Sequence, residues 1–181
     1  MVASSVPAPD EWLHRFPTPC RLEAIGHFAT SAKHAAVVPL PWMIRMAGEN
    51  LWNTAVSFMS SAASRKVLLE PLQTLIKCVA TLKITEESDD ELKEFCTKLY
   101  VVLFECLADA GRWSDGLAAT EKSLKRLPAS CHKSLWDFRI TFMGKLGKDT
   151  TAEMLRVKES GEAMVEPPLL PTLSHTAAPP L

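Results

Sequence analysis

Apolar residues recur at the spacing of one helix face along most of this chain, and the pattern is strongest between residues 92 and 110. The face is formed at positions i, i+3, i+4 and i+7 by Tyr100, Leu103, Phe104 and Leu107. This spacing predicts a helix over 92–110. We expect Gly111 to end it, because glycine accepts the left-handed conformation that closes many helices.

A second helix is predicted from about Trp113 until Pro128 stops it. Its apolar side consists of Trp113, Leu117, Leu124 and Leu127. We expect Trp113 to be a core residue that fastens this helix to the preceding one, and Gly116 to let the two approach closely. Such a hairpin exposes more apolar surface than it can cover alone, so it should stack on neighbouring helices.

Helical segments are also predicted upstream. A weak one spans about 21–37, and a second begins at Pro41, a residue that suits a first helical turn. A third begins near Arg65 or Glu70, depending on whether Pro71 lies in its first turn or kinks it. The stripes expected to be buried are Trp52, Ala55, Val56 and Met59 in the second helix and Leu68, Leu72, Leu75, Val79 and Leu82 in the third. Trp42, beside two prolines, is expected to be partly exposed.

A polar break, TEESDDE, separates the third helix from the strongest one. Ser88 and Glu91 have the spacing of a capping box. Six acidic residues lie between Glu86 and Glu94. We interpret them as a solvated loop and a first turn whose negative charge suits a helix N-terminus, with an acidic docking patch as the alternative.

Proline marks both ends of the chain. Residues 1–20 are expected to be irregular, and residues 161–181 form a Pro-rich tail that we expect to be disordered. Residues 21–160 are the predicted helical array. The predicted fold is therefore all-α.

The strongest hairpin is partly repeated thirty-six residues later. The equivalent pairs are Tyr100 and Trp136, Phe104 and Ile140, Leu107 and Met143, Gly111 and Gly147, and Gly116 and Ala152. Leu103 falls on Arg139 and Trp113 on Asp149, so the second unit is divergent. We expect two hairpins, at about 97–130 and 131–160, with Trp136 in the core.

The first hairpin resembles a tetratricopeptide repeat, a helical hairpin of about 34 residues that stacks into a superhelix. The matching positions are the large Tyr100, the following Leu103, the small Gly116 and Ser123, and the closing Pro128. Phe104 and Thr120 depart from the pattern, which has a small residue and an aromatic there. The resemblance implies a short α-solenoid of degenerate tetratricopeptide-like hairpins.

Three longer segments are similar to the large tetratricopeptide-containing cilia- and flagella-associated proteins of the axonemal central apparatus. They are PLPWMIRMAGENLWNTAVSF, EPLQTLIKCVATLKITEESDDELK and YVVLFECLADAGRW. The resemblance implies a non-enzymatic scaffold in the cytoskeleton of a cilium or flagellum, contributing to cilium movement. Its partners would be axonemal projection components or microtubule-associated proteins. Those proteins are much longer, so the chain would be a fragment or a short isoform.

Composition limits the other function classes. The chain has 181 residues, 47% of them hydrophobic, and a formal net charge of −1, which argues against a general nucleic-acid binder. Its apolar runs are shorter than the roughly 18 residues of a membrane span. We therefore expect a cytoplasmic protein that binds neither nucleic acid nor membrane.

Candidate chemistry is sparse. Five widely spaced cysteines predict reduced thiols rather than a disulfide framework: Cys20, Cys78, Cys96, Cys106 and Cys131. Adjacent Cys131 and His132 could be half of a metal site, but no second pair stands at zinc-type spacing. We expect no catalytic residue, no metal, no cofactor and no small-molecule substrate. The alternatives are an accessory helical domain of an enzyme, with thiol chemistry at Cys131 and His132, and a cytosolic adaptor unrelated to cilia.

A basic run between Lys122 and Lys148 is the candidate interaction surface, with Asp137 as its single acidic residue. One interpretation, which needs no binding partner, is a solvated face with cations at helix ends. The functional one is a strip that docks an acidic partner, or that contacts microtubules directly. Its candidate docking residues are Lys122, Lys125, Arg126, Lys133 and Arg139.

Overall fold

The computed structural model describes the backbone of residues 18–38 and 40–162, and the side chains of that part up to residue 158. These residues form helices and short 3-10 turns, with no strand among them. The helices are α2 (Thr18–Val37), α3 (Pro41–Ala55), α4 (Ala62–Arg65), α5 (Leu69–Val79), α6 (Asp90–Asp109), α7 (Trp113–Arg126), α8 (His132–Lys145) and α9 (Thr151–Glu162), and the 3-10 turns are η1 (Val56–Phe58), η2 (Lys66–Leu68) and η3 (Ala129–Cys131). The all-α prediction is confirmed for this part of the chain. Residues 18–20, predicted to be irregular, belong to α2, and residues 161–162, predicted to be disordered, belong to α9. The rest of both predicted tails lies outside the described residues.

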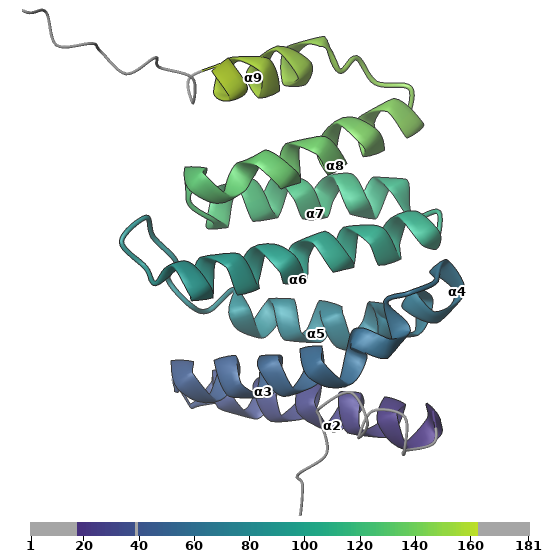
Figure 1. The fold of residues 1–181 in the computed structure, drawn as a ribbon, viewed down its shortest axis with the longest axis vertical. Coiled ribbons are helices and arrows are strands. Elements are labelled where there is room, and N and C mark those ends of the chain that lie inside the picture. Colours follow the sequence, from purple (N-terminus) through teal and green to yellow (C-terminus); the bar gives the residue numbers. More distant parts are fainter. Residues whose placement is uncertain (1–17, 39, 163–181) are drawn as a thin grey trace, which may run out of the picture.

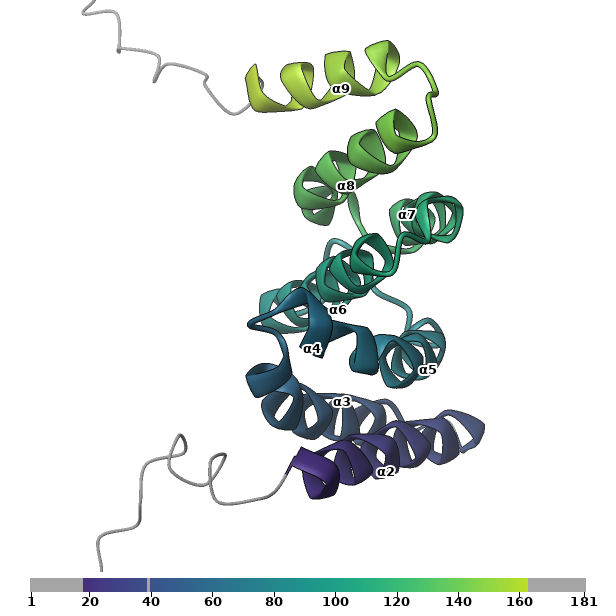
Figure 2. The same ribbon diagram turned by 90° about the vertical axis from the view of Figure 1, so that its right-hand side faces the viewer.

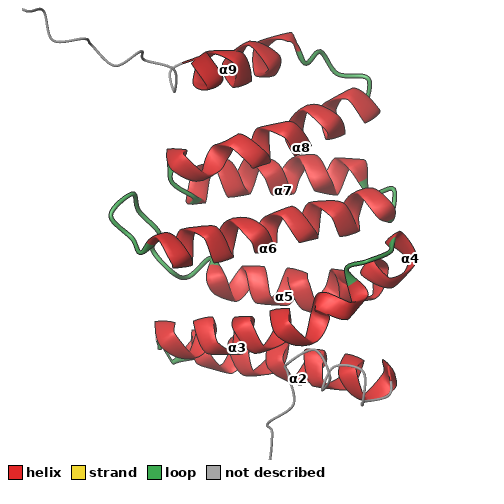
Figure 3. Cartoon of the chain, in the orientation of Figure 1, coloured by secondary structure: helices red, strands yellow, loops and turns green. Residues whose placement is uncertain are grey.

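The helices are stacked along the long axis of the molecule, from α2 at one end to α9 at the other (Figure 1). Each long helix packs on a neighbour in sequence, and α2 also packs on α5 and α6 on α8. Turned by 90°, α5 and α7 lie on one side of the stack and α6 and α8 on the other (Figure 2). The longer loops join α5 to α6 and α8 to α9 (Figure 3). No described helix is both long and apolar enough to cross a membrane.

Proline sets the boundaries of the upstream helices. Pro41 occupies the first turn of α3, as predicted. Pro71 lies in the first turn of α5, which settles the question left open by the sequence. Because Pro71 has no N–H to offer the carbonyl four residues earlier, α4 and α5 do not form one helix, and η2 separates them.

The buried face of α3 differs from the predicted stripe. It consists of Ile44, Ala47, Gly48, Leu51 and Ala55. Of the predicted residues, Val56 is exposed, because the chain changes from α-helix to 3-10 turn at this residue and the helical period ends. Trp42 is 61% exposed at the start of α3, as expected.

The predicted capping box before α6 is wrong. Asp89 is the N-cap residue, and its carboxylate accepts a hydrogen bond from the Glu91 N–H at 3.4 Å. Ser88 instead completes the preceding turn, where its hydroxyl accepts from the Thr85 N–H at 2.9 Å. With Ser88 occupied in that turn, the next residue caps the helix, and aspartate is among the best N-cap residues.

Gly111 and Gly147, which were predicted to be equivalent, each form a turn of the same kind. Gly111 and Gly147 have φ angles of 67° and 68°, in the left-handed region that favours glycine. The Arg112 N–H donates to the Leu107 carbonyl at 2.9 Å, and the Lys148 N–H donates to that of Met143 at 3.0 Å. Both turns are therefore Schellman motifs related by the thirty-six-residue shift.

An aromatic cluster joins the two hairpins. Phe104 of α6 lies 5.5 Å from Phe138 and 6.1 Å from Phe142 of α8, measured between ring centroids. Phe142 is fully buried, and a Cβ built on Gly116 would lie 2.5 Å from its ring. Gly116 therefore allows α7 to approach α8, whereas the sequence predicted a close approach to α6.

Neither tryptophan predicted to be core is fully buried. The Trp113 ring is half-buried against the core, and it lies 6.3 Å from the Phe142 ring of α8. Trp136 is half-buried too, with the guanidinium groups of Arg139 and Arg156 over its ring at 5.8 and 5.6 Å. Both rings lie where cations can cover their outer faces; Lys145 covers that of Trp113 at 5.7 Å.

Candidate protein-interaction site

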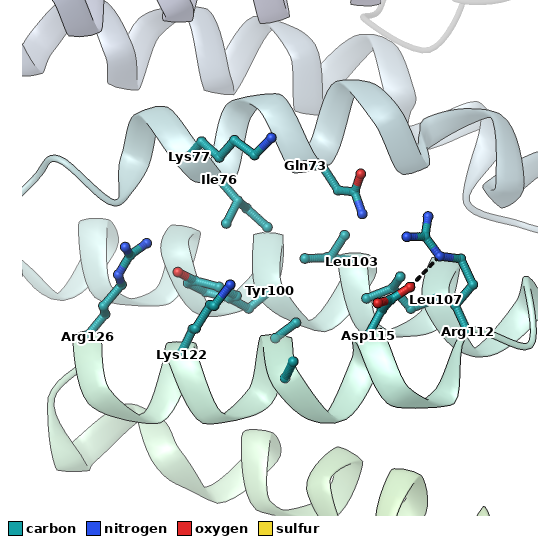
Figure 4. Close-up of a pocket in the computed structure, with 12 residues that line it drawn as sticks. Gln73, Ile76, Lys77, Tyr100, Leu103, Leu107, Arg112, Asp115, Lys122 and Arg126 are labelled. Carbon is teal, nitrogen blue, oxygen red and sulfur yellow. Dashed lines mark hydrogen bonds and ion pairs between the residues drawn. The ribbon is translucent and has the colours of Figure 1, made fainter.

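A hollow of about 360 Å³ opens between α5 and α7, with α6 as its floor (Figure 4). We call it the basic hollow. Its lining residues are Gln73, Ile76 and Lys77 of α5, Tyr100, Leu103 and Leu107 of α6, and Arg112, Asp115, Ala118, Ala119, Lys122 and Arg126 at and along α7. The hollow thus combines an apolar floor with charged walls.

The basic hollow exists because its two walls do not meet. Both α5 and α7 pack on α6, but they do not pack closely on each other. Ala118 and Ala119, which line the α7 wall, are too short to bridge the gap. The buried side chains of Leu103 and Leu107 close the bottom and belong to the stripe that predicted α6.

Positive charge gathers at one end of this hollow. Lys122 and Arg126 of α7 lie there beside Tyr100, and Lys77 of α5 lies across the hollow from them (Figure 4). Burial raises the pKa of Tyr100, and the nearby Arg126 guanidinium opposes that rise. Tyr100 is therefore a neutral hydroxyl at physiological pH and leaves the cations uncompensated.

The other end of the basic hollow is neutralised within the chain. The Arg112 Nε lies 2.7 Å from the Asp115 carboxylate. Among the described residues, no carboxylate forms an ion pair with Lys77, Lys122 or Arg126. The unpaired charge thus lies at the Tyr100 end.

The structure divides the five cations of the predicted docking strip among three hollows. Lys122 and Arg126 line the basic hollow, whereas Lys125 and Arg139 line a hollow of about 270 Å³ beside Trp136. Lys133 lines a third, of about 330 Å³, near the start of α6. The strip is not one continuous surface, because successive helical residues point about 100° apart.

Arg139 has a role within the fold. Its guanidinium lies 3.2 Å from the Glu121 carboxylate of α7 and 3.4 Å from the Glu153 carboxylate of α9. Its side chain is 18% exposed. Arg139 therefore joins α7, α8 and α9, and little of its charge is free for a partner.

The acidic segment before α6 also forms internal contacts. Arg45 of α3 lies 3.3 Å from the Asp89 carboxylate and 3.0 Å from that of Glu91, so it ties α3 to the start of α6. Glu86 accepts a hydrogen bond from the Ser130 hydroxyl at 2.7 Å. This bond holds the pKa of Glu86 below its usual range. These contacts favour a structural role for the segment over a docking patch.

His132 contacts the backbone at the end of α7. The His132 Nε2 lies 2.8 Å from the Leu127 carbonyl oxygen. The described residues contain no group of three side chains able to hold a metal ion. Cys78, Cys96 and Cys106 are buried, Cys20 is exposed, and all the described cysteines are free thiols.

Sequence reasoning found only part of the basic hollow. Lys122 and Arg126 were candidates because they lie in the basic run, and their i, i+4 spacing is the signal that they share a face. Lys77 was missed because it lies in another helix. No local pattern indicates that α5 and α7 lie across a gap from each other.

The described residues thus form an all-helical stack with a charged hollow between α5 and α7. No protein-family model matches the sequence. Over 140 residues the chain is 30% identical to Cilia- and flagella-associated protein 46 of Chlamydomonas reinhardtii. The match covers 77% of this chain and 5% of the relative, so the chain spans about a twentieth of that protein's length. This similarity supports a distant relation to the cilia- and flagella-associated proteins.

Proposed function

We propose that the chain is a non-enzymatic protein–protein interaction scaffold of the cilium or flagellum. The similarity to Cilia- and flagella-associated protein 46 carries this proposal. The finer part of it places the chain in the axonemal central apparatus, where it contributes to cilium movement. Its partners are then axonemal projection components or microtubule-associated proteins.

The architecture supports a scaffold. Helices stacked in sequence order present long side surfaces, and the paired turns at Gly111 and Gly147 suit a short solenoid of tetratricopeptide-like hairpins. Stacked hairpins of this kind bind partners along extended faces. The free cations of the basic hollow would steer an acidic partner, and apolar anchors would supply most of the affinity.

Proximity labelling tests the cellular part of the proposal. The full chain, fused to a biotin ligase, is expressed in ciliated cells, with the ligase alone as the control. We expect biotinylation enriched in axonemal proteins over that control. Labelling spread evenly through the cytosol would instead favour an adaptor unrelated to cilia.

The enzyme alternative has its own test. Cys131→Ala should leave partner capture unchanged, because Cys131 lies outside the basic hollow. If the wild-type chain shows a hydrolase or transferase activity that this substitution removes, the chain acts as an enzyme rather than as a scaffold.

A further inference from the structure

We infer that the basic hollow binds an acidic protein segment in which an apolar side chain lies next to two carboxylates. The inference rests on the proposed scaffold function and names the kind of partner that one surface accepts. It depends on the hollow as the structure defines it, between α5 and α7, and not on the basic run of the sequence.

The charge of the hollow calls for an anionic occupant. Lys77 extends from one wall and Lys122 and Arg126 from the other, at the same end (Figure 4). Like charges around one concave site repel, and low-dielectric walls strengthen their field. Among the described residues, none of the three cations has a carboxylate partner, so an incoming anion need not displace an existing ion pair.

The floor of the hollow calls for an apolar group as well. Ile76 and Leu103 lie next to Tyr100 at the charged end, Leu107 lies at the Arg112–Asp115 end, and the α7 wall contributes Ala118 and Ala119 (Figure 4). An apolar side chain placed there would be removed from water. Lys122 and Arg126, one helical turn apart, can then each meet one carboxylate of the same segment.

These features favour a protein segment over nucleic acid. A single-stranded polynucleotide is bound by a groove whose cations follow the backbone and whose exposed aromatic rings stack on the bases. Here the free cations lie at one end, and the single aromatic residue of the lining, Tyr100, is 3% exposed. A single ring at one end does not provide the succession of stacking surfaces that a polynucleotide uses, whereas carboxylates flanking an apolar side chain match both parts of the hollow.

Fluorescence anisotropy tests the inference with the full chain. The probe is a short fluorescein-labelled peptide with a central leucine between paired glutamates. One control peptide has glutamine for glutamate, one has serine for leucine, and the third probe is a single-stranded RNA of equal charge. We expect binding of the acidic peptide, and each control peptide to bind about tenfold more weakly or worse.

Two double variants separate the hollow from the strip. Lys122→Glu with Arg126→Glu should weaken acidic-peptide binding by about tenfold or more. Lys125→Glu with Lys133→Glu changes the net charge equally but alters cations outside the basic hollow, and should change binding by less than about threefold. Ala118→Trp should also block binding, because Ala118 is exposed and its replacement would fill the hollow without disturbing the core.

Equal loss in both double variants would overturn the inference, since it would indicate general charge attraction. Tighter binding of RNA than of the acidic peptide would overturn it as well. Absence of peptide binding, together with axonemal labelling by the same chain, would reject this site but retain the scaffold function. Peptide binding without axonemal labelling would retain the site and reject the ciliary role.

Discussion

Gly116 of α7 lies directly against the ring of Phe142 in α8. A Cβ at this position would lie 2.5 to 2.8 Å from three ring atoms, and Phe142 is fully buried and cannot move aside. We predict that Gly116→Ala lowers the free energy of unfolding by about 1–3 kcal/mol, the usual cost of overpacking, despite alanine's better helix propensity. Urea denaturation followed by circular dichroism measures the change.

Gly26 and Gly144 are the matched controls for this substitution. Both lie inside helices, and a Cβ on either would have no neighbouring atom within 4 Å. Alanine at either position should raise the free energy of unfolding, by up to about 1 kcal/mol. A stabilised Gly116→Ala variant would show that α7 and α8 are not in close contact in solution.

Gly111 should be intolerant of alanine for a different reason. No atom crowds it, but its φ of 67° disfavours any residue with a Cβ. We expect Gly111→Ala to lower the free energy of unfolding by about 1–2 kcal/mol. Gly111→Asn should lower the free energy of unfolding by less, because asparagine tolerates the left-handed region. Equal losses of stability in the two variants would argue against a conformational cause.

Arg65 and Asp109 form an ion pair that should be stronger than a surface pair. The Arg65 Nε lies 2.8 Å from the Asp109 carboxylate, the two side chains are 21% and 17% exposed, and Arg65 also donates to the Met59 carbonyl. A double-mutant cycle with Arg65→Gln and Asp109→Asn should give a coupling energy of about 1–3 kcal/mol. Thermal or urea denaturation of the four proteins supplies the values.

Arg112 and Asp115 provide the control cycle. They have the same geometry at 2.7 Å, but their side chains are about half exposed, at 45% and 54%. Their coupling energy should stay below about 1 kcal/mol and fall with added salt. Equal coupling energies in the two cycles would show that burial does not strengthen the Arg65–Asp109 ion pair.

The buried thiols should make the fold sensitive to alkaline pH. Burial raises the pKa of Cys96 and that of Cys106 to about 12, from an ordinary value of 9.0. The folded state therefore favours the protonated thiols, and their contribution to stability is complete below pH 9. As the pH rises toward 12 the unfolded chain releases these protons first, so the free energy of unfolding should fall over that interval. A Cys96→Ala, Cys106→Ala variant should lose less of its stability over the same interval.

Alkylation gives an independent measurement of the same burial. At pH 8 in native conditions, iodoacetamide should modify exposed Cys20 quickly, and buried Cys96 and Cys106 only on the timescale of unfolding. Mass spectrometry reports each site separately. Rapid modification of Cys96 would contradict the helix packing described here.

The sequence predicted local features of this fold better than contacts between distant elements. Gly111 was correctly predicted to end a helix, and Gly147, predicted to be its equivalent, adopts the same left-handed conformation, which is a local requirement. The stripe of α6 was also correct. Helical period identifies which face is buried, but not which helix covers it. For this reason the close approach at Gly116 was assigned to α6, whereas the nearest side chain, Phe142, lies in α8.

The candidate site shows the same limit. The basic run contained Lys122 and Arg126, but its other members face different hollows, and Lys77 lies in a helix that no pattern connected to them. The prediction of Ser88 as the N-cap residue was wrong because Ser88 and the adjacent Asp89 could both cap α6. The preceding turn engages Ser88, so Asp89 caps the helix. Competition between local hydrogen bonds of similar energy is not visible in spacing alone.

The contact between Gly116 and Phe142 also determines what can fold as a unit. Pro128 is the natural place to divide the sequence into hairpins, yet the ring that fills the space over Gly116 and packs against Phe104 lies beyond it. A chain cut at Pro128 would leave an unfilled gap over α7 and an uncovered phenylalanine on α6. The cooperative unit therefore spans the hairpin boundary, and the repeat defined by sequence is not a folding module in its own right.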